Sequence, residues 1–190
     1  MLASDERHAK YLLAPEMATL IRCTDDWRHE LLFATLWYTG GKIGEVLALK
    51  NTDVRLEPEA QVVQFPIKGG GGTRSIEITD PYFQGVLERG LRARGEVSDQ
   101  PILGITRQSA SQWLKARMEH LDSRVPGGFV DVDVTFNTFR HSFAFNALLH
   151  AVPLQTLQHW LGHSNPEMTR RYMSYLGHDS REHMARVCFS

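Results

Sequence analysis

Residues 135–175 read TFNTFRHSFAFNALLHAVPLQTLQHWLGHSNPEMTRRYMSY, and the rest of the chain is organised around this stretch. Arg140 opens a predicted amphipathic helix, because apolar residues recur after it at helical spacing. Pro153 suits the first turn of a second helix, where its missing N–H costs nothing. The buried side of that second helix would carry three leucines, Leu154, Leu157 and Leu161.

The end of the same stretch places a histidine and a tyrosine near the ends of short helices. Gly162 is typical of a helix C-terminus, so His163 should lie just past the second helix. Ser164 or Asn165 can cap a third helix, and Tyr172 would then lie about two turns into it. The stretch therefore predicts three helical segments separated by turns.

A glycine pair separates two predicted helices earlier in the chain. Residues 27–38 are too rich in apolar groups for a free surface, so we expect this helix to be central to the core. Gly40 and Gly41 end it, and Lys42 opens the next helix. A cation at a helix start opposes the helix dipole. Lys42 is therefore either a simple solvated lysine or a residue that meets a phosphate at this helix start.

Two predicted strands, residues 61–67 and 74–79, are rich in β-branched side chains and are separated by the glycines at 69–72. They predict a hairpin with Lys68 near its tip. A nucleotide-binding loop is the obvious rival, but the lysine precedes the glycines and no Gly-Lys-Ser/Thr follows. On its own, a lysine beside glycines would more often be simple surface charge.

Further helices are predicted to start at Ala14 and to span residues 81–94 and 109–121. In the last of these, Gln112 and Lys115 share the face opposite to the apolar stripe. With the hairpin, these segments predict a mainly α fold with a small antiparallel β-sheet.

Composition bounds the class of protein. At 190 residues the chain fits one domain with its own core, and 42% hydrophobic and 23% charged residues are ordinary for a globular protein. Lys and Arg total 21 against 22 Asp and Glu, so the formal net charge is −1. Net charge gives no support for nucleic-acid binding, and any DNA site must come from local clusters of basic groups.

Cysteine usage and hydropathy exclude other classes. Cys23 and Cys188 do not make a disulfide framework or a zinc site, and we interpret them as reduced thiols. No apolar run approaches the roughly 18 residues of a membrane span. Charged residues at 5–7 interrupt the N-terminus, so we expect no signal peptide. We therefore expect a cytoplasmic protein with no membrane partner.

The order Arg-His, then Leu-Gly-His, then a tyrosine nine residues after that histidine resembles the tyrosine recombinases of the phage-integrase type. Residues 39–49, TGGKIGEVLAL, resemble the first catalytic box of this family, and residues 67–74, IKGGGGTR, resemble its lysine-bearing hairpin. The resemblance implies the tyrosine recombinase catalytic-domain fold. It also implies a site-specific recombinase or integrase, in which a tyrosine attacks a DNA phosphodiester and becomes joined to the 3′ end.

The resemblance implies a role for each catalytic residue. Tyr172 would be the nucleophile, with Tyr175 as its nearest competitor, and nearby cations would lower the cost of the phenolate. Arg140 would clamp the phosphate through two parallel N–H bonds. His163 would donate a further hydrogen bond to the phosphate, and Lys68 would protonate the departing 5′ oxygen.

Two positions depart from the family pattern. Lys42 stands where the first box normally carries arginine, so it would supply a second cation without the planar fork. Asn137 stands where the second box normally carries histidine. An amide can donate a hydrogen bond to phosphate but cannot take a proton at pH 7. We interpret His141, which follows Arg140, as a packed structural residue.

The resemblance also implies the partners. Double-stranded DNA would be bound through Arg74, Arg107, Gln112 and Lys115, although the face that carries the last two is equally explained as a solvated one. The family works as assemblies on DNA, so we expect a homo-oligomer, a tetramer, on DNA. Residues 180–190 would help to hold the protomers together, unless they pack on their own domain.

No cofactor is expected, because the phosphotyrosine bond conserves the energy of the broken ester. His159 and His163 have the spacing of two zinc ligands, but Trp160 replaces the glutamate of that zinc motif. We expect residues 1–190 to form a single catalytic domain, with the N-terminal core-binding DNA-clamp domain of the family not present in this chain.

Two alternatives stay open. A catalytically degenerate DNA-binding relative with a regulatory role would keep the fold and the DNA contacts, while Lys42 and Asn137 leave the chemistry weak or absent. A protein-assembly module would lack both DNA binding and catalysis, and the retained Lys68, Arg140 and Tyr172 argue against it.

Overall fold

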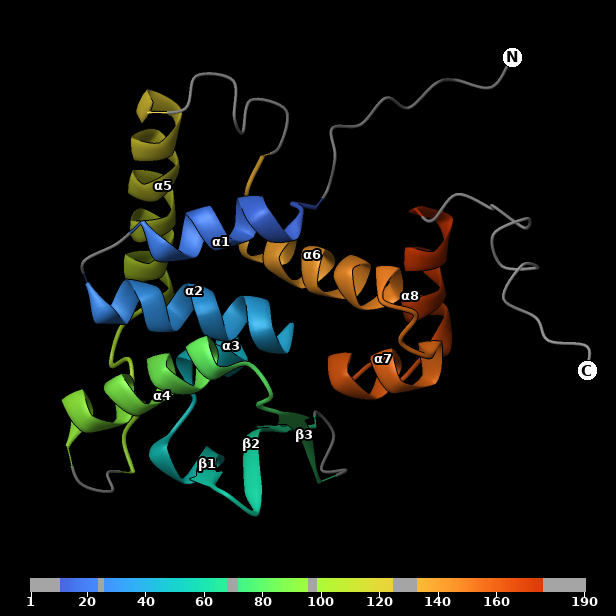
Figure 1. Cartoon of the computed structure of the whole chain (residues 1–190), viewed down its shortest axis with the longest axis horizontal. Coiled ribbons are helices and arrows are strands. Elements are labelled where there is room, and N and C mark those ends of the chain that lie inside the picture. The colour runs from blue at the N-terminus through green and yellow to red at the C-terminus, as the bar shows by residue number, and fades with distance from the viewer. Residues whose placement is uncertain (1–10, 24–25, 68–71, 96–98, 125–132, 176–190) are drawn as a thin grey trace, which may run out of the picture.

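A computed structural model describes residues 11–23, 26–67, 72–95, 99–124 and 133–175, and Figure 1 shows their arrangement. Helices dominate, as expected. The described α-helices are α1 (Ala14–Arg22), α2 (Trp27–Thr39), α3 (Ile43–Leu47), α4 (Pro81–Arg94), α5 (Arg107–Arg124), α6 (Phe136–Leu149), α7 (Leu154–Leu161) and α8 (Pro166–Arg170). Short 3₁₀ helices span η1 (Asn51–Asp53) and η2 (Arg171–Tyr175).

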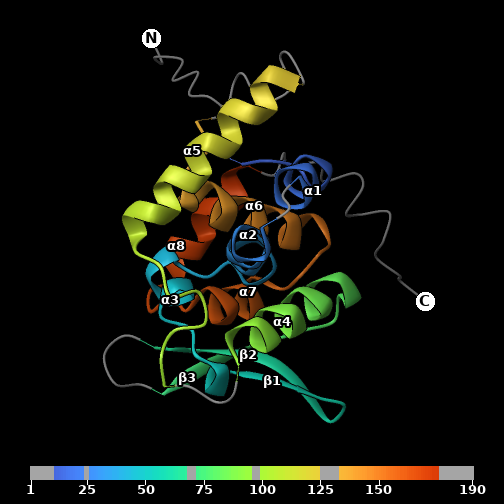
Figure 2. The same cartoon turned by 90° about the vertical axis from the view of Figure 1, so that its left-hand side faces the viewer.

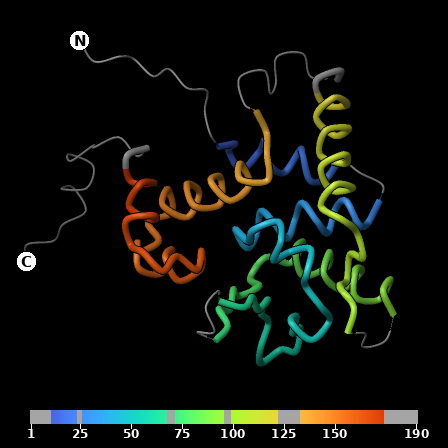
Figure 3. The backbone as a smooth tube through the Cα atoms, turned by 180° about the vertical axis from the view of Figure 1, so that it is seen from behind, coloured from blue at the N-terminus to red at the C-terminus, as the bar shows by residue number. Residues whose placement is uncertain are grey.

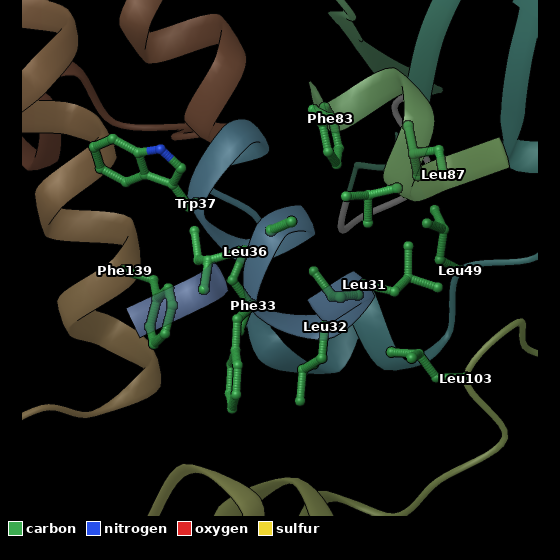
Figure 4. Close-up of a cluster of buried hydrophobic side chains, with 14 of the residues drawn as sticks. Leu31, Leu32, Phe33, Leu36, Trp37, Leu49, Phe83, Leu87, Leu103 and Phe139 are labelled. Atoms are coloured by element: carbon green, nitrogen blue, oxygen red, sulfur yellow. The ribbon is translucent and has the colours of Figure 1, made fainter. Parts of the chain in front are cut away.

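Helix α2 is the centre of the core, as its composition predicted. Residues on nearly all of its sides are buried, and α1, α3, α4 and α6 all pack against it. Figure 4 shows Leu31 on one side of this helix and Phe33 close to Phe139 of α6. The Asp26 side chain accepts a hydrogen bond from the Arg28 amide and caps the helix.

The sheet contains the predicted hairpin and one more strand. Strands β1 (Val54–Glu57), β2 (Ala60–Pro66) and β3 (Thr73–Glu77) are antiparallel in the order β1-β2-β3. Val63 of β2 is the partner of both Val54 and Ile76, and all three side chains are buried. Figure 2 shows the sheet beneath α4. The buried positions of β2 and β3 are Val63, Phe65 and Ile76, together with the charged Arg74.

The C-terminal helices form a second apolar cluster that adjoins the main core. Its buried members are Ala144, Ala147, Leu148, Leu157, Leu161 and Tyr172. Seen from behind in Figure 3, these helices (orange to red) lie on the opposite side of the molecule from α5 (yellow). This cluster fixes where the ends of α7 and η2 lie, and those ends carry the predicted site residues.

Two of the local predictions in this region, for Pro153 and Arg140, need correction. Pro153 takes the N-cap position of α7, one residue before the first turn. Gly162 ends α7 in the left-handed conformation, at φ 64°, and the Asn165 side chain caps α8. Arg140, however, does not open α6. Thr135 takes the N-cap position, so the helix begins at Phe136 and Arg140 lies one turn inside it.

Two expectations concern the outer parts of the chain. The oligomerisation role predicted for residues 180–190 falls outside the described residues. Within the described ranges, no helix combines the length and the apolar character that crossing a membrane requires.

Candidate active site

Arg140 ties together three separate elements. Its guanidinium donates to the Gly40 carbonyl at 2.7 Å and to the Leu161 carbonyl at 2.6 Å, and only 6% of the side chain is exposed. These carbonyls belong to the ends of α2 and α7, whose helices stop there because Gly40 and Gly162 are left-handed. Burial lowers the pKa of Arg140, although an arginine stays charged. A fixed cation therefore lies where these helix ends meet.

Tyr172 lies beside that cation. Its side chain is 6% exposed and packs in the C-terminal apolar cluster. Its hydroxyl lies 3.0 Å from His141 Nδ1, and a side-chain hydrogen bond also links Tyr172 with Arg140. The fold therefore holds the phenol oxygen against a guanidinium and an imidazole, which is the environment that a tyrosine nucleophile needs.

The ring of His163 lies near that of the same tyrosine. Its ring is nearly parallel to that of Tyr172, with 6.5 Å between ring centroids and 5° between planes. Burial, followed by the charges of Arg140, Lys42 and Arg74, lowers the pKa of His163 to about 4. The imidazole is therefore neutral at pH 7, and it can donate a hydrogen bond from one nitrogen only.

The Thr169 hydroxyl occupies one nitrogen of His163. The buried Thr169 hydroxyl lies 2.9 Å from His163 Nδ1. When the hydroxyl donates to Nδ1, the ring proton must be on Nε2, which is then free to act as a donor.

Lys42 adds an exposed cation to the site. It is the N-cap residue of α3, and its side chain borders two adjoining pockets. The smaller pocket, of about 440 Å³, also has His163 and Gly162 in its wall. The larger pocket, of about 880 Å³, is lined by Asn137 and Arg107. Lys42 thus connects the tyrosine side of the site with the start of α5.

Arg74 is not where we expected it. The sequence suggested a DNA-facing cation on the hairpin, but the side chain is 2% exposed. It donates to both carboxylate oxygens of Glu45, at 2.8 and 3.2 Å, and to the Trp160 carbonyl at 2.8 Å. Because its guanidinium is already engaged inside the fold, we withdraw Arg74 from the proposed DNA contacts.

Glu45 is a residue that sequence reasoning missed. Burial acts to raise the pKa of its carboxyl group, but hydrogen bonds from Arg74 and the Lys42 amide outweigh burial and hold the pKa below its ordinary value. The carboxylate stays ionised and anchors β3 to the start of α3. No local pattern could have revealed this pair, because its members are 29 positions apart.

His141 is the other missed residue. We expected a packed structural histidine, yet its Nδ1 atom touches the hydroxyl of Tyr172. The two residues are 31 positions apart, and only the packing of η2 against α6 brings them together.

Three of the remaining predicted residues lie on the surface of α5. Arg107, Gln112 and Lys115 are exposed on α5, and the Lys115 ammonium lies 3.8 Å from Glu119. Of these, Arg107 lines the larger pocket with Lys42. Lys68 falls outside the described residues. Across the described ranges, no group of three or more His, Cys, Asp or Glu side chains is placed to hold a metal ion.

Similarity to known proteins extends over most of the chain. Residues 10–179 match the family model described as "Phage integrase family". The chain is 29% identical over 171 residues to a "Probable site-specific recombinase in afa region" of Escherichia coli, covering 85% of this chain and 69% of that protein. It is 30% identical over 190 residues to a "Resolvase" of Escherichia coli, covering 86% of this chain and 72% of that protein.

A solved structure supports the fold independently. The crystal structure of XerH site-specific recombinase bound to difH substrate, a pre-cleavage complex, superposes with a TM-score of 0.70 at 19% identity. The superposition covers 96% of this chain and 55% of that chain, so this chain spans about half of that recombinase. At this identity the match shows the shared fold, with its small antiparallel sheet among helices.

Proposed function

The chain belongs to the phage integrase family, and on that basis we propose that it is a site-specific recombinase that cuts and rejoins DNA through a 3′-phosphotyrosine intermediate on Tyr172. The side chains around Tyr172 support this residue as the nucleophile. The Tyr172 hydroxyl lies next to Arg140 and His141, and the Tyr172 ring is nearly parallel to the ring of His163.

The geometry suits phosphoryl transfer. In the proposed step the Tyr172 oxygen forms a bond to phosphorus while the bond from phosphorus to the 5′ oxygen breaks. Arg140 and Lys42 neutralise the non-bridging oxygens, and His163 donates to them through Nε2. Lys68 supplies the proton to the leaving 5′ oxygen. The new ester conserves the energy of the old one, so reversal of the step rejoins DNA.

Double-stranded DNA is the proposed partner. The XerH structure is a complex with its difH substrate, and the same fold in this chain presents Lys42, Asn137 and Arg107 along one pocket. We propose that this pocket meets the phosphate backbone, with Gln112 and Lys115 extending the contact along α5. Assembly as a tetramer on DNA, a single catalytic domain over residues 1–190 and a cytoplasmic location are further parts of the proposal.

The alternative of a degenerate DNA-binding relative gains nothing from the comparisons, because the two Escherichia coli relatives are named as a recombinase and a resolvase. Lys42 keeps a cation at the first-box position. The changes at Lys42 and Asn137 therefore bear on the rate and leave the reaction class intact.

Covalent capture tests the function and finds the target sequence in the same experiment. A pool of nicked duplexes with randomised sequence is incubated with the protein. Cleavage near the nick releases a short fragment that diffuses away, so the reaction cannot reverse and the covalent adduct accumulates. Recovered protein–DNA adducts are sequenced to identify the site. We expect adducts from the unaltered chain and none from Tyr172→Phe, with the modified peptide containing Tyr172. Adducts that map to Tyr175 would contradict the assignment of the nucleophile, and their complete absence would contradict the function.

A further inference from the structure

His141 stands in direct contact with the atom that reacts. Its Nδ1 atom lies 3.0 Å from the Tyr172 oxygen, within normal hydrogen-bond range, with 5.6 Å between the ring centroids. The contact joins α6 to η2, and both side chains are at least partly buried. His141 immediately follows Arg140, so one turn of α6 presents both a phosphate-binding cation and an imidazole to the tyrosine.

The neighbouring arginine favours one direction for this hydrogen bond. A guanidinium can only donate, so in its hydrogen bond with Arg140 the Tyr172 oxygen accepts. When the hydroxyl proton points to His141, Nδ1 is the unprotonated nitrogen and accepts that hydrogen bond. In this arrangement the imidazole already accepts a hydrogen bond from the proton that it would remove, which is the geometry of a general base.

Other groups near the tyrosine are poorly suited to take that proton. Asn137 carries an amide, which is not a base at neutral pH. His163 has its Nδ1 occupied by Thr169, and its pKa of about 4 makes it a weak base. Glu45 is held in two hydrogen bonds by Arg74. Among the described residues, the charged and titratable groups that face the His141–Tyr172 pair include Arg140 from α6 and His163 from the turn after α7.

We propose that His141 is a catalytic residue that accepts the phenolic proton of Tyr172 as the tyrosine attacks the scissile phosphate. The inference rests on the proposed function. As the bond from the Tyr172 oxygen to phosphorus forms, the O–H proton moves to His141 Nδ1. The bond from phosphorus to the 5′ oxygen breaks, and that oxygen takes its proton from Lys68. In the rejoining step His141 returns its proton to Tyr172.

Two substitutions separate proton transfer from hydrogen bonding and packing. In His141→Asn the amide nitrogen or oxygen can occupy the place of Nδ1 and still bond to the hydroxyl, but it cannot take a proton. His141→Phe keeps the ring and removes both functions. His150→Asn is the matched control, because His150 lies at the exposed end of the same helix. The assay is single-turnover adduct formation on the duplex recovered by covalent capture, with DNA affinity measured in parallel.

We expect His141→Asn and His141→Phe to slow adduct formation by about 10²- to 10⁴-fold, the usual range for loss of a general base, with unchanged DNA affinity. His150→Asn should react at the normal rate. If the Phe variant does not fold, the Asn variant decides. A His141→Asn variant that reacts as fast as the unaltered chain would overturn the proposal, because hydrogen bonding alone would then suffice.

A sulfur substitution at the leaving group identifies which proton is affected. A duplex with sulfur in place of the bridging 5′ oxygen has a leaving group that departs readily without protonation, because a thiol is far more acidic than an alcohol. This duplex should rescue Lys68→Ala and leave His141→Asn slow. Rescue of His141→Asn would assign the residue to the leaving group and overturn the inference. Failure of the unaltered chain to form any adduct would instead overturn the proposed function, and the inference with it.

Discussion

Arg74 and Glu45 form a bidentate salt bridge inside the fold, with hydrogen bonds of 2.8 and 3.2 Å between side chains that are 2% and 13% exposed. The bridge links β3 to the first turn of α3, and a third bond ties Arg74 to the end of α7 at the Trp160 carbonyl. Gly162 lies two residues further on, and a Cβ there would meet the Arg74 side chain at 3.1 Å. The bridge therefore positions both Lys42 and His163.

Breaking this bridge should destabilise the protein strongly. Glu45→Gln leaves the buried Arg74 charge without its counter-ion, which typically costs about 3–5 kcal/mol. We expect a loss of this size in the free energy of unfolding measured by urea titration. Glu88→Gln is the matched control, because its pair with Arg92 lies at the surface and should contribute at most about 1 kcal/mol. Equal small effects in both variants would contradict the bridge.

Stability should fall as the solution becomes acidic. The folded-state pKa of His163 is about 4, below its ordinary 6.5, so the unfolded chain binds the proton first. This contribution is fully present above pH 6.5 and is lost as pH falls toward 4. The pKa of Glu45 is also lowered from its ordinary value of 4.5, so the free energy of unfolding should fall further as the pH drops below 4.5. His163→Gln should flatten the curve of unfolding free energy between pH 6.5 and 4, and an unchanged curve would refute this assignment.

Thr169 should act as a positioning residue for His163. Thr169→Val keeps the buried shape but removes the hydroxyl that meets Nδ1. Loss of one hydrogen bond of about 0.5–1.5 kcal/mol predicts adduct formation roughly 2- to 10-fold slower. Nitrogen NMR of His163 should show a mixture of tautomers in this variant, and Thr169→Ser should restore both readouts. A purely structural role would leave the tautomer unchanged.

The two departures from the family pattern should limit the rate. Lys42→Arg replaces a point charge by a fork that makes two charge-assisted bonds, and one such bond is worth roughly 1.5–3 kcal/mol. Lys42 is exposed beside a pocket of about 880 Å³, so a guanidinium has room. We expect a roughly 10- to 100-fold faster cleavage.

Asn137→His should add to the rate most clearly near neutral pH, where imidazole titrates. Both positions line the same pocket, so the two gains should not simply add. Single-turnover cleavage by all four combinations measures this. A double variant no faster than the natural chain would favour the degenerate, DNA-binding alternative.

DNA affinity should depend on salt through the exposed cations of α5. Each phosphate contact contributes about −0.9 to the slope of log K against log salt on duplex DNA. Arg107→Gln should therefore make the slope shallower by about 0.9, whereas Gln112→Ala, which removes no charge, should leave it unchanged. A slope unaffected by Arg107→Gln would exclude this residue from the DNA contacts.

Local patterns in the chain predicted most of the elements, because helix caps, helix ends and periodicity depend on interactions within a few residues. Gly162 ends α7 since a left-handed residue is needed there, and the Asn165 side chain caps α8 by accepting a hydrogen bond from the Glu167 amide. The abundance of β-branched residues on both sides of the glycines predicted β2 and β3, but β1 was missed because its four residues are too few to show a period. The ordered motifs also identified the family, which the matching family model confirms.

The tertiary structure alone decided what the charged and titratable side chains do. Arg74 was predicted to face DNA, and its partners Glu45 and Trp160, 29 and 86 positions away, hold it inside instead. His141 was predicted to be structural, and the packing of η2 brings Tyr172 to its ring nitrogen. A hydrogen bond requires two atoms within about 3 Å and correctly aligned. Only the packing of distant segments sets such a distance, so no local pattern in the chain can encode it.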